Sequence, residues 1–236
     1  MGENQLTYLM SSAFKLETVR GHTICPARLN SESVVIDAGA HRGEFSRILM
    51  ARYGCQCQLV EANPELAAQL IGKNFVRVLP AALSAQDGRA SFIKRNNPEH
   101  GGIFNRAHDD DNAVSEIETI SLETFVRRFA LTQIDLLKLD IEGAEFDLIE
   151  KTSDQILDCI GQITVEFHDF LPEFKGRGVY EKAKHRLETL GFVACCMAFR
   201  THGDVLFLNR KMFRMNLASK LWLRHGERWL GKLKSS

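Results

Sequence analysis

Short apolar segments alternate with amphipathic segments from residue 34 to residue 190. The apolar segments have the length and composition of buried strands, which are predicted at Val34–Ala38, Cys57–Glu61, Val76–Leu79, Glu116–Leu122, Leu136–Asp140 and Gln162–Phe167. The segments between them have helical spacing, which predicts helices near Phe45–Tyr53, Pro64–Ile71, Gly143–Lys151 and Tyr180–Leu190. This alternation is typical of a doubly wound α/β fold, in which helices cover both faces of a mostly parallel sheet.

Two hairpins are predicted in addition to these elements. Asp87-Gly88 is a typical hairpin turn, and it predicts antiparallel pairing of Ala81–Ala85 with Arg89–Arg95. Near the end of the chain, Phe192–Phe199 and Asp204–Leu208 flank a short polar turn. These two segments predict a C-terminal antiparallel hairpin added to the parallel sheet.

Three segments lie outside the alternating pattern. Residues 1–32 combine helical spacing with a loop around Pro26, which predicts an N-terminal helical cap. The polar segment Asn96–Asn112 fits a mobile lid or substrate loop and a disordered surface loop equally well. Residues 210–236 form a basic amphipathic C-terminal tail. We expect this tail to dock on its own domain or on a second subunit of a homo-oligomer, the alternative being contact with a membrane surface.

The chain has 236 residues with 30 basic and 30 acidic side chains, so we expect one sizeable domain without a dominant electrostatic attraction for nucleic acid. Its six cysteines do not have the paired spacing of a zinc site, which indicates buried thiols in a reducing compartment. No apolar stretch is long enough to span a bilayer, and the N-terminus has no signal-peptide pattern. We therefore expect a cytoplasmic protein with no transmembrane segment and no nucleic-acid partner.

The first predicted strand ends in a glycine-containing turn, Asp37-Ala38-Gly39-Ala40-His41-Arg42-Gly43, which leads into a helix. Open α/β sheets bind nucleotide-like cofactors at such turns. The spacing is D-x-G-x-x-x-G and not the G-x-G-x-x-G of dinucleotide sites, which favours a cofactor with an adenosine and no phosphates. S-adenosylmethionine fits this description, and its candidate contacts here are Asp37, Gly39, Ala40, His41, Gly43 and Ser46.

The second predicted strand ends at Glu61, about 20 residues after the glycine turn, where a ribose-binding acid is found in such sheets. A carboxylate at this place accepts hydrogen bonds from both ribose hydroxyls. The alternative is a solvated glutamate at a strand end, but the glycine turn favours the ribose contact. Ala62 and Asn63 complete this part of the candidate cofactor site, and Asn63 is the expected cap of the helix that begins at Pro64.

Two further strands bring acids to the same edge of the sheet. One is followed by Asp140, Glu142 and Glu145, and the next ends with Glu166 and His168 on one face. Acids crowded beside an apolar strand are costly unless a charged group uses them. Because the carboxyl ends of neighbouring parallel strands meet, one shared rim is expected for Asp37, Glu61, Asp140, Glu142, Glu166 and His168.

These motifs resemble those of the FkbM-type S-adenosylmethionine-dependent methyltransferases. The resemblance covers roughly Ser33 to Leu208, and its most specific part is the block Lys138-Leu139-Asp140-Ile141-Glu142-Gly143-Ala144-Glu145. The family often has Asn at the position of His41 and an apolar residue at that of Arg42. Other matching segments are Val35–Gly43, Val60–Pro64, Ala82–Ser84 with Asp87-Gly88, Ser121–Glu123 and Glu166–His168.

The resemblance implies a Rossmann-like methyltransferase domain over residues 33–209. S-adenosylmethionine would lie across Gly39–Gly43, with its ribose on Glu61 and its adenine near Ala82, Leu83 and Ser84. Known members methylate hydroxyl groups, so the expected acceptor is a sugar, a glycan or a secondary metabolite. The alternatives are N-methylation of a small amine and a methyltransferase-like protein that binds the cofactor without turnover. A nicotinamide dehydrogenase is disfavoured because the dinucleotide spacing is missing.

The expected reaction is direct in-line displacement of the methyl group by the acceptor oxygen, with positioning as a main source of acceleration. Because a hydroxyl is a weak nucleophile, we expect help from a base or a metal. His168 is the predicted base, as a neutral imidazole near pH 7, and the alternative is a structural histidine. Asp140, Glu142 and Glu166 complete the catalytic set and are also the candidate ligands of a divalent cation, Mg²⁺ or Ca²⁺. Lys138 is expected to pair with a nearby carboxylate.

Overall fold

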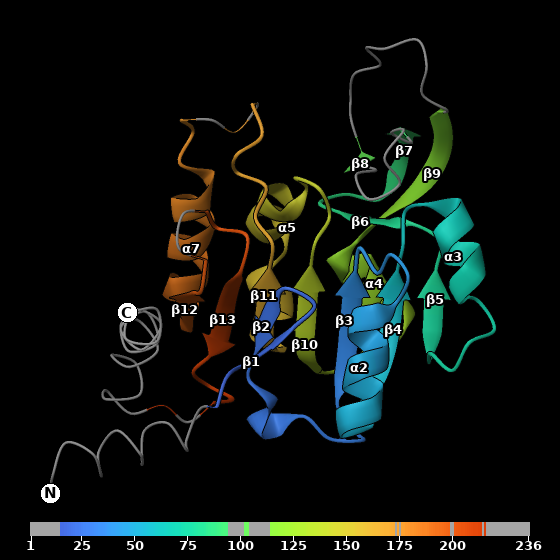
Figure 1. Cartoon of the computed structure of the whole chain (residues 1–236). Coiled ribbons are helices and arrows are strands. Elements are labelled where there is room, and N and C mark those ends of the chain that lie inside the picture. Colours follow the sequence, from blue (N-terminus) through green and yellow to red (C-terminus); the bar gives the residue numbers. More distant parts are fainter. Residues whose placement is uncertain are drawn as a thin grey trace, which may run out of the picture.

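Figure 1 shows the computed structural model of the protein, which describes residues 15–93, 102–103, 114–172, 174, 176–198, 201–213 and 215. Its centre is a seven-stranded sheet with the order β12-β13-β11-β10-β3-β4-β5. The strands are β3 (Val34–Ala38), β4 (Gln56–Val60), β5 (Arg77–Leu79), β10 (Ile134–Leu139), β11 (Ile160–Val165), β12 (Phe192–Cys196) and β13 (Val205–Asn209). All pairs from β5 to β11 are parallel, and β13 and β12 add an antiparallel hairpin. The predicted α/β sheet with a C-terminal antiparallel hairpin is confirmed.

The direction in which the sheet grows reverses between β3 and β10. From β3 the chain adds β4 and then β5 on one side, and β10 is followed by β11 on the other side. Ligands of open α/β sheets bind outside the carboxyl ends of the strands at such a reversal. The register pairs Asp37 with Lys138 and Ala38 with Leu139, so two chemical motifs of the sequence lie side by side at this point.

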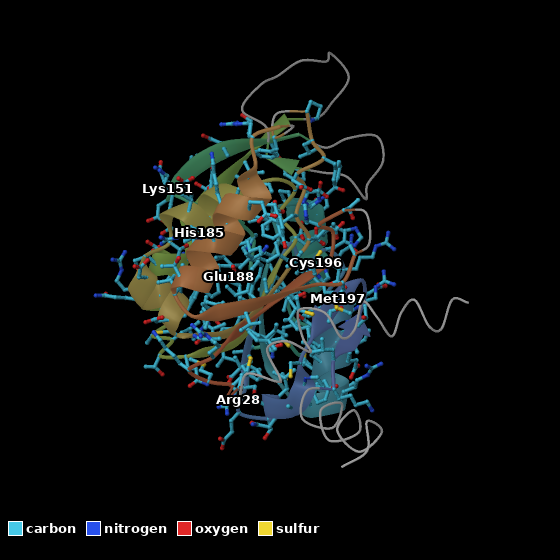
Figure 2. The ribbon with its side chains drawn as sticks, turned by 90° about the vertical axis from the view of Figure 1, so that its left-hand side faces the viewer. Arg28, Lys151, His185, Glu188, Cys196 and Met197 are labelled. Atoms are coloured by element: carbon cyan, nitrogen blue, oxygen red, sulfur yellow. The ribbon has the colours of Figure 1, made fainter. Side chains whose placement is uncertain are left out.

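Helices cover both faces of the sheet because successive strand residues point to opposite sides. Val35 and Leu136 face a core shared with α2 and α3, and Ile36 and Leu137 face a core shared with α4, α5 and α7. Figure 1 shows α2 in front of the sheet, and Figure 2 views the molecule from the side of α7. The helices are α2 (Glu44–Tyr53), α3 (Pro64–Leu70), α4 (Leu122–Arg128), α5 (Glu145–Lys151), α6 (Asp154–Asp158) and α7 (Val179–Thr189).

A second sheet has four strands in the order β6-β9-β7-β8. Its strands are β6 (Ala82–Ser84), β7 (Gly88–Ile93), β8 (Gly102–Ile103) and β9 (Val114–Ser121). The predicted hairpin is wrong, because β9 lies between β6 and β7, parallel to the first and antiparallel to the second.

Asp87 explains why the turn does not close a hairpin. Its carboxylate accepts hydrogen bonds from Ser121 N at 2.7 Å and from Thr124 Oγ1 at 2.6 Å. The turn residue is therefore tied to the junction of β9 and α4. These contacts between distant segments outweigh the local preference of Asp87-Gly88 for a two-residue hairpin.

The first described elements form a small hairpin of β1 (Glu17–Val19) and β2 (His22–Ile24), followed by a 3₁₀ helix, η1 (Pro26–Arg28). Thr23 donates to the Asp204 carboxylate, from N at 2.8 Å and from Oγ1 at 2.6 Å. The buried side chain of Gln162 accepts from Cys25 N at 2.8 Å and donates to Cys25 O at 3.0 Å. These bonds dock the hairpin on β11 and on the start of β13.

Several predicted segments lie largely outside the described residues. They are the helical spacing before residue 15, the polar segment 96–112 apart from β8, and the tail beyond residue 215. The division into cap, domain and tail therefore stays a prediction. In the part of the chain that the structure describes, no helix is long and apolar enough to cross a membrane.

Replacing Gln162 by Met is expected to weaken the docking of the β1–β2 hairpin, because two buried backbone groups of Cys25 lose their partners. We expect the free energy of unfolding to fall by about 2–5 kcal/mol. Urea unfolding followed by circular dichroism measures this change. Gln155→Met on exposed residue 155 of α6 is the matched control, with an expected change within about 0.5 kcal/mol. Equal stabilities of the two variants would show that the Gln162 bonds do not hold the hairpin.

Candidate active site

A cavity of about 320 Å³ opens at the carboxyl ends of β3, β4 and β10. The predicted site residues in its wall are Gly39, Ala40, His41, Glu61, Ala62, Asn63, Ala82, Leu83, Asp140 and Glu142. The predicted residues that do not line it are Asp37, Gly43, Ser46, Ser84, Glu166 and His168. The structure therefore brings most of the predicted cofactor residues to one cavity, while several predicted polar residues lie behind its wall.

The glycines of the first turn make room for the protein's own chain. Gly39 has a φ of 75°, and a Cβ atom there would lie 1.8 Å from the carbonyl oxygen of Asp140. At Gly43, with a φ of 71°, a Cβ atom would lie 2.9 Å from the Phe75 ring and 3.0 Å from Leu70 Cδ2. Gly39 thus permits the close approach of β3 and β10 beside the cavity, whereas Gly43 permits the packing of the start of α2.

Glu61 is buried and held by two backbone groups. Its Oε2 accepts from His41 N at 2.6 Å, and its Oε1 accepts from Asn63 N at 2.7 Å. Burial raises the pKa of the Glu61 carboxyl, while these two N–H groups oppose the rise. An ionised carboxylate accepts about four hydrogen bonds, so each oxygen keeps one acceptor position for a ligand in the cavity.

Lys138 lies buried between two carboxylates, which confirms the predicted pairing. Its Nζ is 3.2 Å from Asp37 Oδ1 and 3.5 Å from Asp140 Oδ2, and it donates to Gly39 O at 2.9 Å. Burial alone would lower the pKa of Lys138, but Asp37 and Asp140 raise it overall. Asp37 also accepts from Ser46 Oγ at 2.7 Å, so it supports the cavity from beneath.

The surroundings of His168 do not favour the predicted neutral imidazole. His168 is buried between two carboxylates, with Nδ1 3.0 Å from Glu145 Oε1 and Nε2 3.5 Å from Glu142 Oε2. Burial alone would lower the pKa of His168, but the hydrogen bond and charge of Glu145, with the charges of Glu142 and Asp140, raise it to about 9. This raised pKa favours a protonated His168 near pH 7, which fits the alternative of a structural histidine.

Two residues of the cavity wall come from the β1–β2 hairpin, and no motif in the sequence identifies them. Arg20 forms an exposed ion pair with Glu44 at 2.8 Å. His22 is buried, with Nε2 3.6 Å from Asp140 Oδ2 and its ring edge-on to Phe45. Only the docking of the hairpin on the sheet brings these side chains to the rim.

The three predicted metal ligands do not form one group among the described residues. One possible donor group consists of His22, Asp140 and Glu166, and another of Asp140, Glu142 and His168. Within each group the donor atoms lie within 4.8 Å of one another. Asp140 belongs to both groups, whereas Glu142 and Glu166 belong to different ones.

Solved structures similar to this chain include two that are named methyltransferases. The fibrillarin pre-rRNA processing protein of Methanococcus jannaschii has a TM-score of 0.43 and 13% identity, over 87% of this chain and 74% of that chain. A methyltransferase from Pyrococcus furiosus has a TM-score of 0.37 and 12% identity, over 86% and 80% of the two chains. The precorrin-6y C5,15-methyltransferase from Geobacter metallireducens GS-15 has a TM-score of 0.38 and 14% identity, over 88% of each chain.

The sequence comparisons determine the family. A protein named Methyltransferase 1 from Beauveria bassiana (strain ARSEF 2860) is 25% identical over 189 residues, which cover 68% of this chain and 72% of that protein. The model of the methyltransferase FkbM domain matches residues 37–206, most of the chain. The protein therefore belongs to the FkbM methyltransferase family and is a methyltransferase, with S-adenosylmethionine as the cofactor that this family implies.

Proposed function

We propose that the protein transfers the methyl group of S-adenosylmethionine to a hydroxyl group of a sugar, a glycan or a secondary metabolite. The observation that carries this proposal is the presence of two differently held carboxylates in one cavity. Glu61 has the position and the free acceptor sites for a ribose, and the carboxylate of Glu142 lines the same cavity.

The residues of the cavity fit this cofactor. A volume of about 320 Å³ lies within the range of roughly 300–1,000 Å³ that is usual for small-molecule sites. Ala82 and Leu83 offer apolar contact for an adenine. Asp140 offers negative charge to the sulfonium and amino groups at the other end of the molecule.

S-adenosylmethionine, when bound, would supply an electrophilic methyl group. A lone pair of the acceptor oxygen would form the new O–C bond while the C–S bond breaks and sulfur keeps its electrons. The hydroxyl proton would then be released. We assign this proton to the carboxylate of Glu142, which lines the cavity and has His168 Nε2 3.5 Å from its Oε2. Asp140 is a weak base, because burial alone would raise its pKa but Lys138 and His22 overcome this effect and hold the pKa well below the usual range.

Glu61→Ala is expected to weaken the binding of S-adenosylhomocysteine on the order of 100-fold, because two charge-assisted hydrogen bonds to the ribose are lost. Isothermal titration calorimetry measures this affinity. Glu32→Ala, at an exposed glutamate before β3, is the control and is expected to bind like the wild type. Unchanged affinity in Glu61→Ala would remove the ribose assignment. Tight binding of NAD, with none of S-adenosylhomocysteine, would overturn the proposed function.

Glu142→Gln is expected to lower the turnover number on the order of 10²–10⁴-fold without changing the affinity for S-adenosylhomocysteine, because the proton acceptor is removed. Turnover is measured as transfer of label from methyl-labelled S-adenosylmethionine to glycan and metabolite extracts, with identification of the labelled atom. Label on nitrogen would favour N-methylation, and equal turnover of variant and wild type would remove Glu142 as the base. If the wild type binds S-adenosylhomocysteine but labels no extract, the result would support the alternative of a methyltransferase-like protein that binds the cofactor without turnover.

The wild-type protein is expected to lose stability between about pH 6.5 and pH 9, because a proton is bound by His168 in the folded state and not in the unfolded state. Glu145, Glu142 and Asp140 are the charges that raise this pKa, so the stabilisation is complete below pH 6.5 and disappears through pH 9. Relative to His168→Gln, we expect a fall of roughly 3 kcal/mol in the free energy of unfolding over this range. Urea unfolding at several pH values tests this, and parallel curves for the two proteins would contradict it.

A further inference from the structure

Three side chains with unused ligand atoms meet at the acidic rim: His22, Asp140 and Glu166. Their donor atoms lie within 4.8 Å of one another. His22 is 2% exposed, and its Nδ1 has no hydrogen-bond partner among the described residues. A buried imidazole nitrogen without a partner is unfavourable unless a ligand or an ion satisfies it.

Glu166 and Asp140 also have free acceptor positions. Glu166 follows the last residue of β11 and is half-buried, and its carboxylate makes no hydrogen bond or ion pair with any other described residue. Both ion pairs of Asp140 within the described chain, to Lys138 and to His22, use Oδ2. Oδ1 of Asp140 and both oxygens of Glu166 are therefore available to a cation.

The charges of this region leave an excess of negative charge. Asp37, Asp140 and Glu166 carry three negative charges when ionised, and Lys138 contributes one positive charge through its contacts with the first two. With His22 in the neutral form that binds metals, these four groups leave two negative charges. The neighbouring Glu142, Glu145 and protonated His168 add no net positive charge. A divalent cation reduces this excess.

We propose that His22, Asp140 and Glu166 form a binding site for one divalent transition-metal cation, for which Mn²⁺ is the best match. One imidazole and two carboxylates form a mixed nitrogen and oxygen set, which suits first-row transition metals better than the all-oxygen sets preferred by Mg²⁺ and Ca²⁺. Three protein ligands also leave coordination positions open for a substrate.

The second donor group is a poorer site for a metal. Both ring nitrogens of His168 already contact carboxylates, Nδ1 with Glu145 at 3.0 Å and Nε2 with Glu142 at 3.5 Å. A metal there would have to displace one of these contacts. His22 has a nitrogen with no such contact, so the ligand set that includes His22 is preferred.

The proposed ligand His22 lies outside residues 37–206, the part of the chain that matches the family model. It reaches the site because the β1–β2 hairpin is docked on β11 and β13. His22 and Asp140 both line the cavity, so the cation would lie beside the acceptor hydroxyl and lower its pKa. Binding of the metal rests on the geometry alone, whereas this role in catalysis rests on the proposed function.

The test is titration of Mn²⁺ into the full chain after removal of metals with EDTA, followed by calorimetry and by electron paramagnetic resonance of free Mn²⁺. We expect one Mn²⁺ per chain, with weaker binding of Mg²⁺ and Ca²⁺. His22→Ala and Glu166→Gln are each expected to raise the Kd for Mn²⁺ by at least about tenfold. His185→Ala is the matched control, because His185 lies exposed on α7 (Figure 2), and its Kd is expected to equal that of the wild type.

Three results would overturn the site: no binding of Mn²⁺ by the wild type, loss of affinity in only one of the two ligand variants, or loss of affinity in His168→Ala alone. Far-ultraviolet circular dichroism identifies a variant that fails to fold, and Glu166→Gln leaves the docked hairpin untouched. S-adenosylhomocysteine is titrated into the same samples. Binding of S-adenosylhomocysteine without binding of Mn²⁺ would rule out the metal site and leave the proposed function intact. Binding of Mn²⁺ without binding of S-adenosylhomocysteine would support the metal site and rule out the proposed function.

Discussion

The buried ammonium group of Lys138 is the interaction on which the arrangement of the site depends. It lies where the sheet reverses direction, in contact with Asp37 of β3, with Asp140 just beyond β10, and with the carbonyl oxygen of Gly39 in the cofactor turn. Each of these charges would be strongly unfavourable if buried alone, and leaving one partner unpaired typically costs about 3–5 kcal/mol. The network therefore joins the two central strands and the turn between β3 and α2 in one relative position.

Two acids of the cavity wall are held by different physical means. Asp140 is kept ionised by Lys138 and His22, whereas Glu61 is oriented by the backbone N–H groups of His41 and Asn63. The contact from His41 requires its left-handed backbone, with a φ of 50°. Asn and His are both enriched in this conformation among non-glycine residues. The replacement of the Asn common in the family by His41 is thus compatible with the same turn, and it changes the side chain at the cavity without changing the support of Glu61.

Local patterns were sufficient to predict the strands of the central sheet and the residues at their ends, whereas β1 and β2 lie in the segment predicted as a helical cap. The strand Val34–Ala38 was predicted with its observed bounds, and the pairing of Lys138 with carboxylates was expected. The failures come from contacts between segments that are distant in sequence. Asp87-Gly88 has hairpin chemistry, but β9 inserts between the two strands. The proton on His168 depends on acids from a neighbouring element, and His22 reaches the rim only through tertiary docking.

The candidate active site combines residues within the family match with residues of the N-terminal hairpin. The glycine turn Asp37–Gly43, Glu61 and Lys138 lie within residues 37–206, which match the family model. Arg20 and His22 of the cavity wall lie outside this range. Because the hairpin is held by its own bonds to β11 and β13, its residues can change without disturbing the contacts of Glu61. Asp140 belongs to both parts, since its Oδ2 contacts Lys138 and His22. A change at His22 therefore alters the charge balance of Asp140 and, through Lys138, that of the turn at Gly39, which couples the hairpin to the centre of the sheet.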